Sequence, residues 1–321
     1  MDLLKLIKSK TKSFEGTFSK QGLDAVVHHI EISESHFEQG KINGEHLYTD
    51  VIYRTNQAFE GALKEAYRIL SSEDPSKKTP FQIEKHFESN NTLKDRVLSQ
   101  FTTYRTEWRN KSTHDYQLFF SSQEALLAIV SVSAFFSILL DQMIEKQSFD
   151  LEREKVARRV KGFFGDGKAY GSMGFMQQAI ELLKLFVEEL NEESVGASEL
   201  KEFELQGRLA GFITAADPEI EVKTEFPIDY GSGRLHIDML LKKGDGRVIV
   251  ELKRPSAEYN RRAREAMEQI KNYLIASKID KGIVFAPSLG SPAREEYREN
   301  FVDTPIGELK IATLSPMMLN K

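Results

Sequence analysis

The sequence predicts a two-domain protein: an N-terminal helical bundle followed by a C-terminal α/β domain. The chain has 321 residues, more than a typical single domain. Apolar residues in about the first 145 positions recur near helical spacing, without the two-residue alternation of strands. After about residue 198, short alternating apolar segments appear, separated by turn residues. We therefore expect a helical domain over residues 1–146, a helical connector over 147–197 and an α/β domain over 198–321.

The composition is ordinary for a globular protein, with 40% hydrophobic and 29% charged residues. The formal net charge of -5 excludes a uniformly basic surface, so binding of nucleic acid would use a local patch. Because the chain has no cysteine, disulfides, cysteine-based zinc sites and a thiol nucleophile are excluded. The first residues, MDLLKLIKSKTKSF, lack the apolar core of a signal peptide. We expect a cytoplasmic protein.

One apolar run, ALLAIVSVSAFFSILL at residues 125–140, is free of charge. It is short for a membrane span, it contains three serines, and Glu124 and Asp141 close it. A buried helix of the bundle is the better interpretation, and no membrane contact is expected. Ser121 and Ser122 are suitable N-caps for this helix.

Two other helices are expected in the first domain, over residues 45–70 and 92–108, with a loop over 71–79 between them. In the connector, a charged stretch and the glycine-rich GDGKAYGSMG precede an amphipathic helix over 175–190. The second domain has the order helix, three strands, helix, strand, which is typical of an α/β sandwich. These elements are expected at residues 199–213, 221–228, 234–241, 247–253, 260–276 and 282–287.

Strand alternation predicts the directions of the side chains in the second expected strand, RLHIDMLL. Leu235, Ile237 and Met239 should share one face, and His236 and Asp238 the other. His236 is more consistent with packing or substrate contact than with a metal ligand.

In the third strand, RVIVELK, Glu251 and Lys253 should share one face. Glu251 is unfavourable to bury in this apolar strand unless another group pairs with it. Asp238, Glu251 and Lys253 can therefore converge at the ends of adjacent strands. Two carboxylates can hold Mg²⁺ or Mn²⁺, which polarises a phosphodiester and activates a bound water. A neighbouring lysine can orient that water or stabilise developing negative charge.

Asp238, a hairpin and then Glu251-x-Lys253 resemble the PD-(D/E)xK nuclease superfamily. Ile237 stands where the motif name has proline. Gln269 and Tyr273, in the following helix, resemble the Q-x-x-x-Y motif of the RecB-like branch, and ELKRP is similar to restriction-type nuclease domains. The resemblance covers roughly residues 198–288.

The resemblance implies a restriction-endonuclease-like fold. Its implied catalytic residues are Asp238, Glu251, Lys253, Gln269 and Tyr273. It also implies metal ligation by Asp238 and Glu251 with an accessory carboxylate from the helix before the first strand. We assign that carboxylate to Glu204, with Glu199 and Glu202 as competitors on the same helix.

A basic patch for phosphates is expected after the motif, with three glutamates interspersed among its cations. The cations are Arg254, Arg261, Arg262, Arg264 and Lys271, and the glutamates are Glu258, Glu265 and Glu268. An alternative remains open for Asp238, Glu251 and Lys253, in which these residues have only a structural role. Glu251 and Lys253 would then form a surface ion pair on an edge strand, and Asp238 would be solvated.

A second motif lies in the helical domain, where TEWRNKSTHDY contains Arg109, Asn110 and His114. The spacing R-N-x-x-x-H between helices resembles the HEPN family, over roughly residues 23–146. That resemblance implies a metal-independent RNase in a homodimer, with His114 as general acid or base, Arg109 stabilising phosphate charge and Asn110 positioning the substrate. The alternative is that Arg109 and His114 only cap and bridge helix ends.

We therefore expect a Mg²⁺- or Mn²⁺-dependent nuclease acting on DNA rather than RNA, with a role in prokaryotic anti-phage defence or as a toxin. A homodimer through the helical domain and a regulatory partner are also expected. Two alternatives remain open. One is a metal-independent HEPN RNase with a nucleic-acid-binding α/β domain, and the other is a non-catalytic nucleic-acid-binding dimer.

Overall fold

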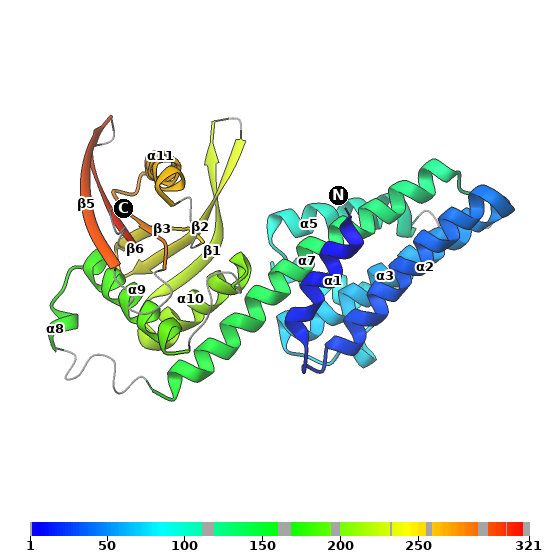
Figure 1. The fold of residues 1–321 in the computed structure, drawn as a ribbon, viewed down its shortest axis with the longest axis horizontal. Helices are drawn as coiled ribbons and strands as arrows, with labels where there is room; N and C mark the ends of the chain where they lie inside the picture. Colours follow the sequence, from blue (N-terminus) through cyan, green and yellow to red (C-terminus); the bar gives the residue numbers. More distant parts are fainter. Residues whose placement is uncertain are drawn as a thin grey trace. The chain divides into compact units, whose positions relative to one another are not determined.

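The computed structural model describes residues 2–110, 119–159, 168–193, 200–231, 233–254, 259–287, 295–305 and 307–316. The chain divides into two compact units, Met1–Lys146 and Gln147–Lys321 (Figure 1). The expected division into a helical part and an α/β part is confirmed, and the sheet of the second part is mixed. The expected helix over 45–70 and the helix at the apolar run are also present.

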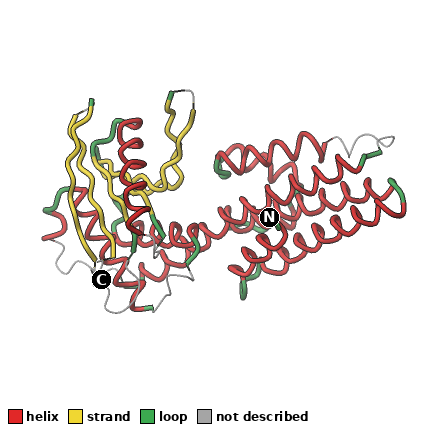
Figure 2. The backbone as a smooth tube through the Cα atoms, turned by 45° about the horizontal axis from the view of Figure 1, so that its top comes forward, coloured by secondary structure: helices red, strands yellow, loops and turns green. Residues whose placement is uncertain are grey.

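All regular elements described in the N-terminal unit are helical (Figure 2). They are α1 (Leu3–Thr11), η1 (Lys12–Phe14), α2 (Lys20–Asn43), α3 (His46–Ser71), η2 (Pro75–Lys77), α4 (Pro80–Ser89), α5 (Asp95–Tyr104), the π turn η3 (Arg105–Arg109) and α7 (Ser122–Ala157), whose residues from Gln147 onward belong to the C-terminal unit. The helix expected over 92–108 is thus shorter, and its last turn is wound as a π-helix.

Local sequence explains where these helices begin and end. Gly44 ends α2 with a φ of 124°, a left-handed conformation that favours glycine. Thr79 and Gln82 form a reciprocal capping box at the start of α4, where Pro80 takes the first helical position.

The apolar helix α7 is long and apolar enough to cross a membrane by length and composition alone. However, 72% of its apolar window is buried within the structure, as in the core helix of a soluble protein. Phe135, Phe136 and Leu139 of this helix pack in the core of the N-terminal unit with Phe59 and Phe101. The prediction of a buried helix is therefore confirmed.

The C-terminal unit is built on a six-stranded mixed sheet of order β1-β2-β3-β4-β6-β5. The pairs β3–β4 and β4–β6 are parallel and the other pairs are antiparallel. The strands are β1 (Glu221–Tyr230), β2 (Gly233–Lys243), β3 (Gly246–Leu252), β4 (Lys281–Phe285), β5 (Glu295–Thr304) and β6 (Gly307–Pro316). The first four agree with the expected strands, whereas the β5–β6 hairpin was not predicted.

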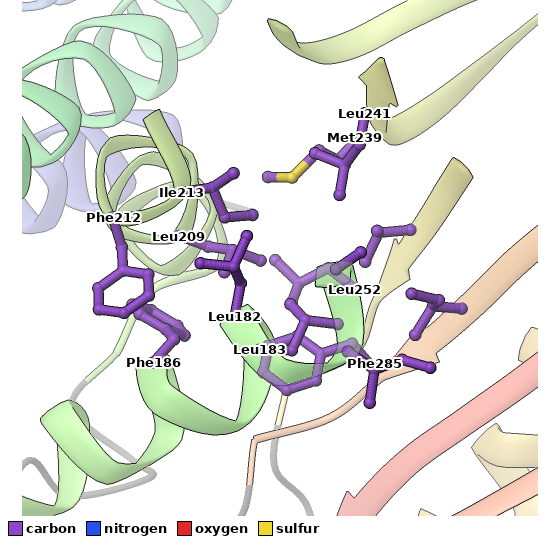
Figure 3. Close-up of a cluster of buried hydrophobic side chains, with 14 of the residues drawn as sticks. Leu182, Leu183, Phe186, Leu209, Phe212, Ile213, Met239, Leu241, Leu252 and Phe285 are labelled. Atoms are coloured by element: carbon purple, nitrogen blue, oxygen red, sulfur yellow. The ribbon is translucent and has the colours of Figure 1, made fainter. Parts of the chain in front are cut away.

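Helices cover both faces of this sheet. Those of the unit are α8 (Lys168–Gly171), α9 (Phe175–Glu192), α10 (Glu202–Ala216) and α11 (Tyr259–Ser277). Side chains of α9 and α10, including Leu183, Phe186 and Phe212, pack with Met239 and Phe285 on one face (Figure 3). Residues of α11 form a separate cluster on the other face. The segment expected to connect the domains therefore supplies α9 to the core of the α/β unit, because its apolar side would otherwise be exposed to water.

Candidate active site at the end of strand β3

The ladder between β1 and β2 is interrupted at one position, where Glu225 lies opposite Asp238. The pairs on either side of it are formed, but this pair is not. Glu225 has a φ of 47°, which is uncommon for a residue with a side chain. The hairpin is therefore kinked at the position of the acidic residue.

This kink corrects the expected alternation in β2. Leu235 and Ile237 pack in the cluster that includes α11, whereas Met239 belongs to the cluster on the opposite face. The prediction that the three share one face is wrong, because the alternation of an uninterrupted strand does not continue through a break in the ladder.

Two hydrogen bonds hold Asp238 at the break. The backbone N–H of Leu252 donates to Oδ2 of Asp238 at 2.8 Å. The amide Nε2 of Gln206, a buried residue of α10, donates to the backbone carbonyl of Asp238 at 3.1 Å. Both the side chain and the backbone of Asp238 are therefore tied to neighbouring elements.

Glu251 occupies the inner strand β3 and is only 1% exposed. Its Oε1 accepts a hydrogen bond from Nζ of Lys253 at 2.5 Å. Its Oε2 is buried and has no hydrogen-bond partner among the described residues. An ionised oxygen in this state is costly, so the site is incomplete as a purely structural ion pair.

A chain of hydrogen bonds extends from Lys253 to α11. Lys253 Nζ donates to Oε1 of Gln269 at 3.1 Å, and Nε2 of Gln269 donates to Oη of Tyr273 at 2.6 Å. Gln269 and Tyr273 are four residues apart and so lie on one side of the helix. The structure thus brings together Asp238, Glu251, Lys253, Gln269 and Tyr273.

Both carboxyl groups have a raised pKa, mainly because they are buried. Burial, and then the charge of Asp238, raise the pKa of Glu251 to about 7. Burial also raises the pKa of Asp238, against the lowering effect of the Leu252 N–H and the Lys253 charge. Burial lowers the pKa of Lys253, but the hydrogen bond and charge of Glu251 outweigh it, so that this pKa is raised. Shifts of this kind are frequent at catalytic sites.

A pocket of about 240 Å³ opens beside this group. It is lined by Glu202, Leu252, Lys253, Arg254, Glu265 and Gln269. Exposed Arg254 supplies a cation at its edge. Of the other cations of the expected basic patch, the side chains of Arg261, Arg262 and Arg264 lie outside the described part of the chain, and Lys271 is half-buried.

The acidic residue that α10 contributes to the pocket is Glu202. Its charge helps to raise the pKa of Asp238. Glu204, the residue assigned from the sequence, does not line the pocket. Helix geometry explains the difference, because Glu202 lies four residues before Gln206, which contacts Asp238, and Glu204 lies only two before it. The four-residue spacing between Glu202 and Gln206 is therefore the sequence feature that could have identified Glu202.

The structure describes Arg109 and Asn110 of the N-terminal motif, while His114 lies outside the described residues. The guanidinium of Arg109 lies 3.7 Å from Oε1 of Glu60 and 4.0 Å from Oε1 of Glu84, and it donates to Oδ1 of Asn110 at 3.3 Å. Glu84 is buried. Arg109 therefore takes part in neutralising a buried carboxylate.

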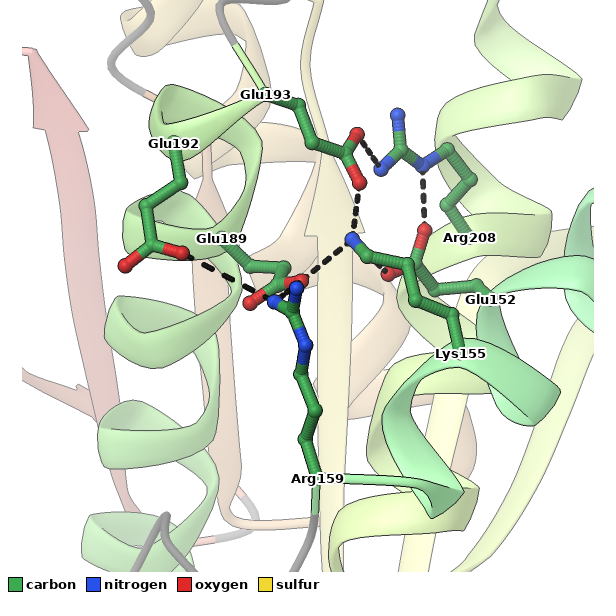
Figure 4. Close-up of polar contacts among 7 residues, drawn as sticks. All are labelled: Glu152, Lys155, Arg159, Glu189, Glu192, Glu193 and Arg208. Carbon is green, nitrogen blue, oxygen red and sulfur yellow. Dashed lines mark hydrogen bonds and ion pairs between the residues drawn. The ribbon is translucent and has the colours of Figure 1, made fainter.

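Another acidic cluster lies where α7, α9 and α10 meet (Figure 4). Carboxylate oxygens of Glu152, Glu189 and Glu193 lie within 4.8 Å of one another, a spacing that could hold a metal ion. However, Lys155 is ion-paired with all three, and Arg208 is ion-paired with Glu152 and Glu193. These cations already neutralise the cluster, which favours a structural ion-pair network.

Comparison of the chain with protein-family models, curated proteins and solved structures gave no match.

Proposed function

We propose that the C-terminal unit is a nuclease that uses Mg²⁺ or Mn²⁺ to hydrolyse phosphodiesters, with DNA preferred to RNA. One observation carries the proposal: the carboxylates of half-buried Asp238 and buried Glu251 lie side by side with Lys253, and one oxygen of Glu251 has no partner among the described residues. The restriction-endonuclease-like fold of the resemblance is part of this proposal. It is supported by a sheet with α10 and α11 on opposite faces.

The residues present fit a divalent cation. Carboxylate oxygens are the ligands that Mg²⁺ and Mn²⁺ prefer, and the unpartnered Oε2 of Glu251 is an acceptor that a cation would satisfy. Asp238 supplies the second carboxylate, and Glu202 lines the adjoining pocket. A bound cation would supply Lewis-acid polarisation of the phosphate and a lowered pKa of its water ligand.

Lys253 provides the cationic group of the site. Glu251 and Gln269 hold its ammonium from two sides. The amide of Gln269 has a defined orientation, because its oxygen accepts from Lys253 and its nitrogen donates to Tyr273. Lys253 is thereby oriented to stabilise the negative charge that develops on a phosphate at the pocket, or to hold the attacking water.

The test is cleavage of plasmid DNA and structured RNA by the full chain in Mg²⁺, Mn²⁺ or EDTA. Metal-dependent cleavage that disappears in both Glu251→Ala and Lys253→Ala supports the proposal. Full cleavage by these variants in Mg²⁺ contradicts it. Cleavage of RNA that persists in EDTA and disappears in His114→Ala would instead assign the chemistry to the helical unit. Tight binding without any cleavage would indicate a binding module.

The biological role that we propose is that of a cytoplasmic effector of prokaryotic anti-phage defence or of toxin type, with a homodimer formed through the helical unit and control by a regulatory partner. The support is the resemblance of the two units to HEPN-like and nuclease modules. Expression in bacteria tests the role. The wild-type chain should reduce growth or phage propagation, whereas Glu251→Ala should not. Sedimentation of the purified chain tests the dimer.

A further inference from the structure

The break in the β1–β2 ladder requires a residue that keeps it open. The β1–β2 register has no pair at the Glu225–Asp238 position, although the pairs on either side are formed. A buried backbone carbonyl without a partner destabilises a protein by about 1–3 kcal/mol. The carbonyl of Asp238 avoids this state because the amide of Gln206 reaches it from α10.

Among the residues that the structure describes, the amide of Gln206 makes no hydrogen bond other than the one to Asp238. It is 3% exposed and lies in a helix whose neighbouring buried residues are apolar or glycine, including Leu205, Gly207 and Leu209. A polar side chain here is unfavourable unless its hydrogen bonds are made. The bond from Nε2 to the carbonyl of Asp238 therefore accounts for its presence.

We propose that Gln206 is the positioning residue of the metal site: by holding the Asp238 carbonyl out of the ladder, it keeps the Asp238 carboxylate beside Glu251. This inference rests on the proposed function. Without the amide donor, the carbonyl is satisfied most easily by a bond to the neighbouring strand. The peptide rotation that such a bond needs moves the carboxylate away from the Leu252 N–H and from Glu251.

The test compares variants of Gln206 with matched variants of Gln178. Gln178 is also buried in the same unit, and its amide donates to the carbonyls of Tyr170 and Met173 at 3.1 Å each. Gln206→Met and Gln178→Met each remove an amide donor but keep most of the side-chain volume. Gln206→Ala removes the amide donor and most of the side-chain volume. The Kd for Mn²⁺ is measured on the full chain by electron paramagnetic resonance of free Mn²⁺, and the Tm of each variant is recorded in EDTA.

We expect Gln206→Met and Gln206→Ala to bind Mn²⁺ about 10- to 100-fold more weakly, as is typical when a group that orients a metal ligand is lost. Gln178→Met should lower the Tm but leave the Kd unchanged. If Gln206→Met binds Mn²⁺ as tightly as the wild type, or if Gln178→Met weakens binding equally, the inference is overturned while the proposed function stands. If the wild type binds no Mn²⁺ and Asp238→Asn makes no difference, the proposed function fails and takes this inference with it.

Discussion

The ammonium of Lys253 lies 2.5 Å from Oε1 of Glu251, a carboxylate that is almost completely buried. Lys253 neutralises only one side of this carboxylate. The other oxygen has no partner among the described residues, and the charge of Asp238 opposes ionisation. In the absence of a cation, the ionised form of Glu251 is therefore a source of instability, as expected for a site shaped by function rather than by stability.

The first prediction concerns stability against pH in EDTA. The pKa of Glu251 is about 7 in the folded protein, above its ordinary value of 4.5. The folded state therefore binds the proton of Glu251 more tightly than the unfolded state does. The contribution of this proton to the free energy of unfolding is complete below pH 4.5 and is lost as the pH rises through 7. We expect the free energy of unfolding to fall between pH 5 and 8, by on the order of 2 to 3 kcal/mol from this group. Urea unfolding measures it.

Glu251→Gln is the reference for this measurement, because it keeps the shape of the side chain and removes the titration. Its pH profile should lack the Glu251 component, so the variant should exceed the wild type in stability at pH 8. Parallel profiles for the two proteins would show that Glu251 does not titrate in this range. Added Mg²⁺ should stabilise the wild type at pH 8 by mass action and leave Glu251→Gln unchanged.

Much of the site could be predicted from the sequence, because its spacing depends on geometry within one element. Glu251 and Lys253 are two residues apart in a strand, and Gln269 and Tyr273 are four apart in a helix, so each pair shares a side. Their mutual contact then needs only the packing of α11 near the end of β3. The structure shows this contact through Lys253 and Gln269.

Features that depend on tertiary contacts could not be predicted. The choice between Glu202 and Glu204 depends on the rotation of α10 about its axis, which its own sequence does not define. The amide that contacts the carbonyl of Asp238 at the kink belongs to Gln206, 32 residues earlier in the chain. Strand β5 was missed because most of its described residues are exposed, so that its sequence has no apolar alternation.

The second prediction concerns the close packing of α10. A Cβ atom added at Gly211 would lie 2.4 Å from the backbone oxygen of Phe149, and backbone cannot yield as a flexible side chain does. Gly211→Ala should therefore lower the free energy of unfolding by about 1–3 kcal/mol. Gly171→Ala is the control, since nothing lies within 4 Å of that position. Equal stability of the two variants in urea would contradict the packing argument.

The third prediction concerns the ion-pair network of Figure 4. Arg208 Nε lies 2.7 Å from Oε2 of Glu152, and both side chains are largely buried. Arg208→Met should lower the free energy of unfolding by about 3 kcal/mol, because it leaves a buried carboxylate with less compensation. The matched control is Arg298→Met, which removes an exposed ion pair with Glu296 and should change stability by less than about 1 kcal/mol. The Mn²⁺ affinity should not change in either variant.

The fourth prediction distinguishes a structural role of Arg109 from a catalytic one. Burial is the main reason that the pKa of Glu84 is raised, and the charges of Arg109 and Arg105 act against it. Arg109→Met should therefore destabilise the protein, by about 1 kcal/mol at the long separation observed. Glu84→Gln should remove most of this effect, because no buried charge then needs a partner.

A double-mutant cycle of Arg109→Met and Glu84→Gln in urea measures this coupling. If the two effects simply add, Arg109 does not stabilise Glu84. Cleavage of RNA in EDTA is measured on the same variants. If the role of Arg109 is structural, Arg109→Met should affect such cleavage only by lowering stability. Adding Glu84→Gln should then restore both the stability and the cleavage. Loss of EDTA-resistant cleavage at unchanged stability, without rescue by Glu84→Gln, would instead show that Arg109 acts on the substrate, as the HEPN resemblance implies.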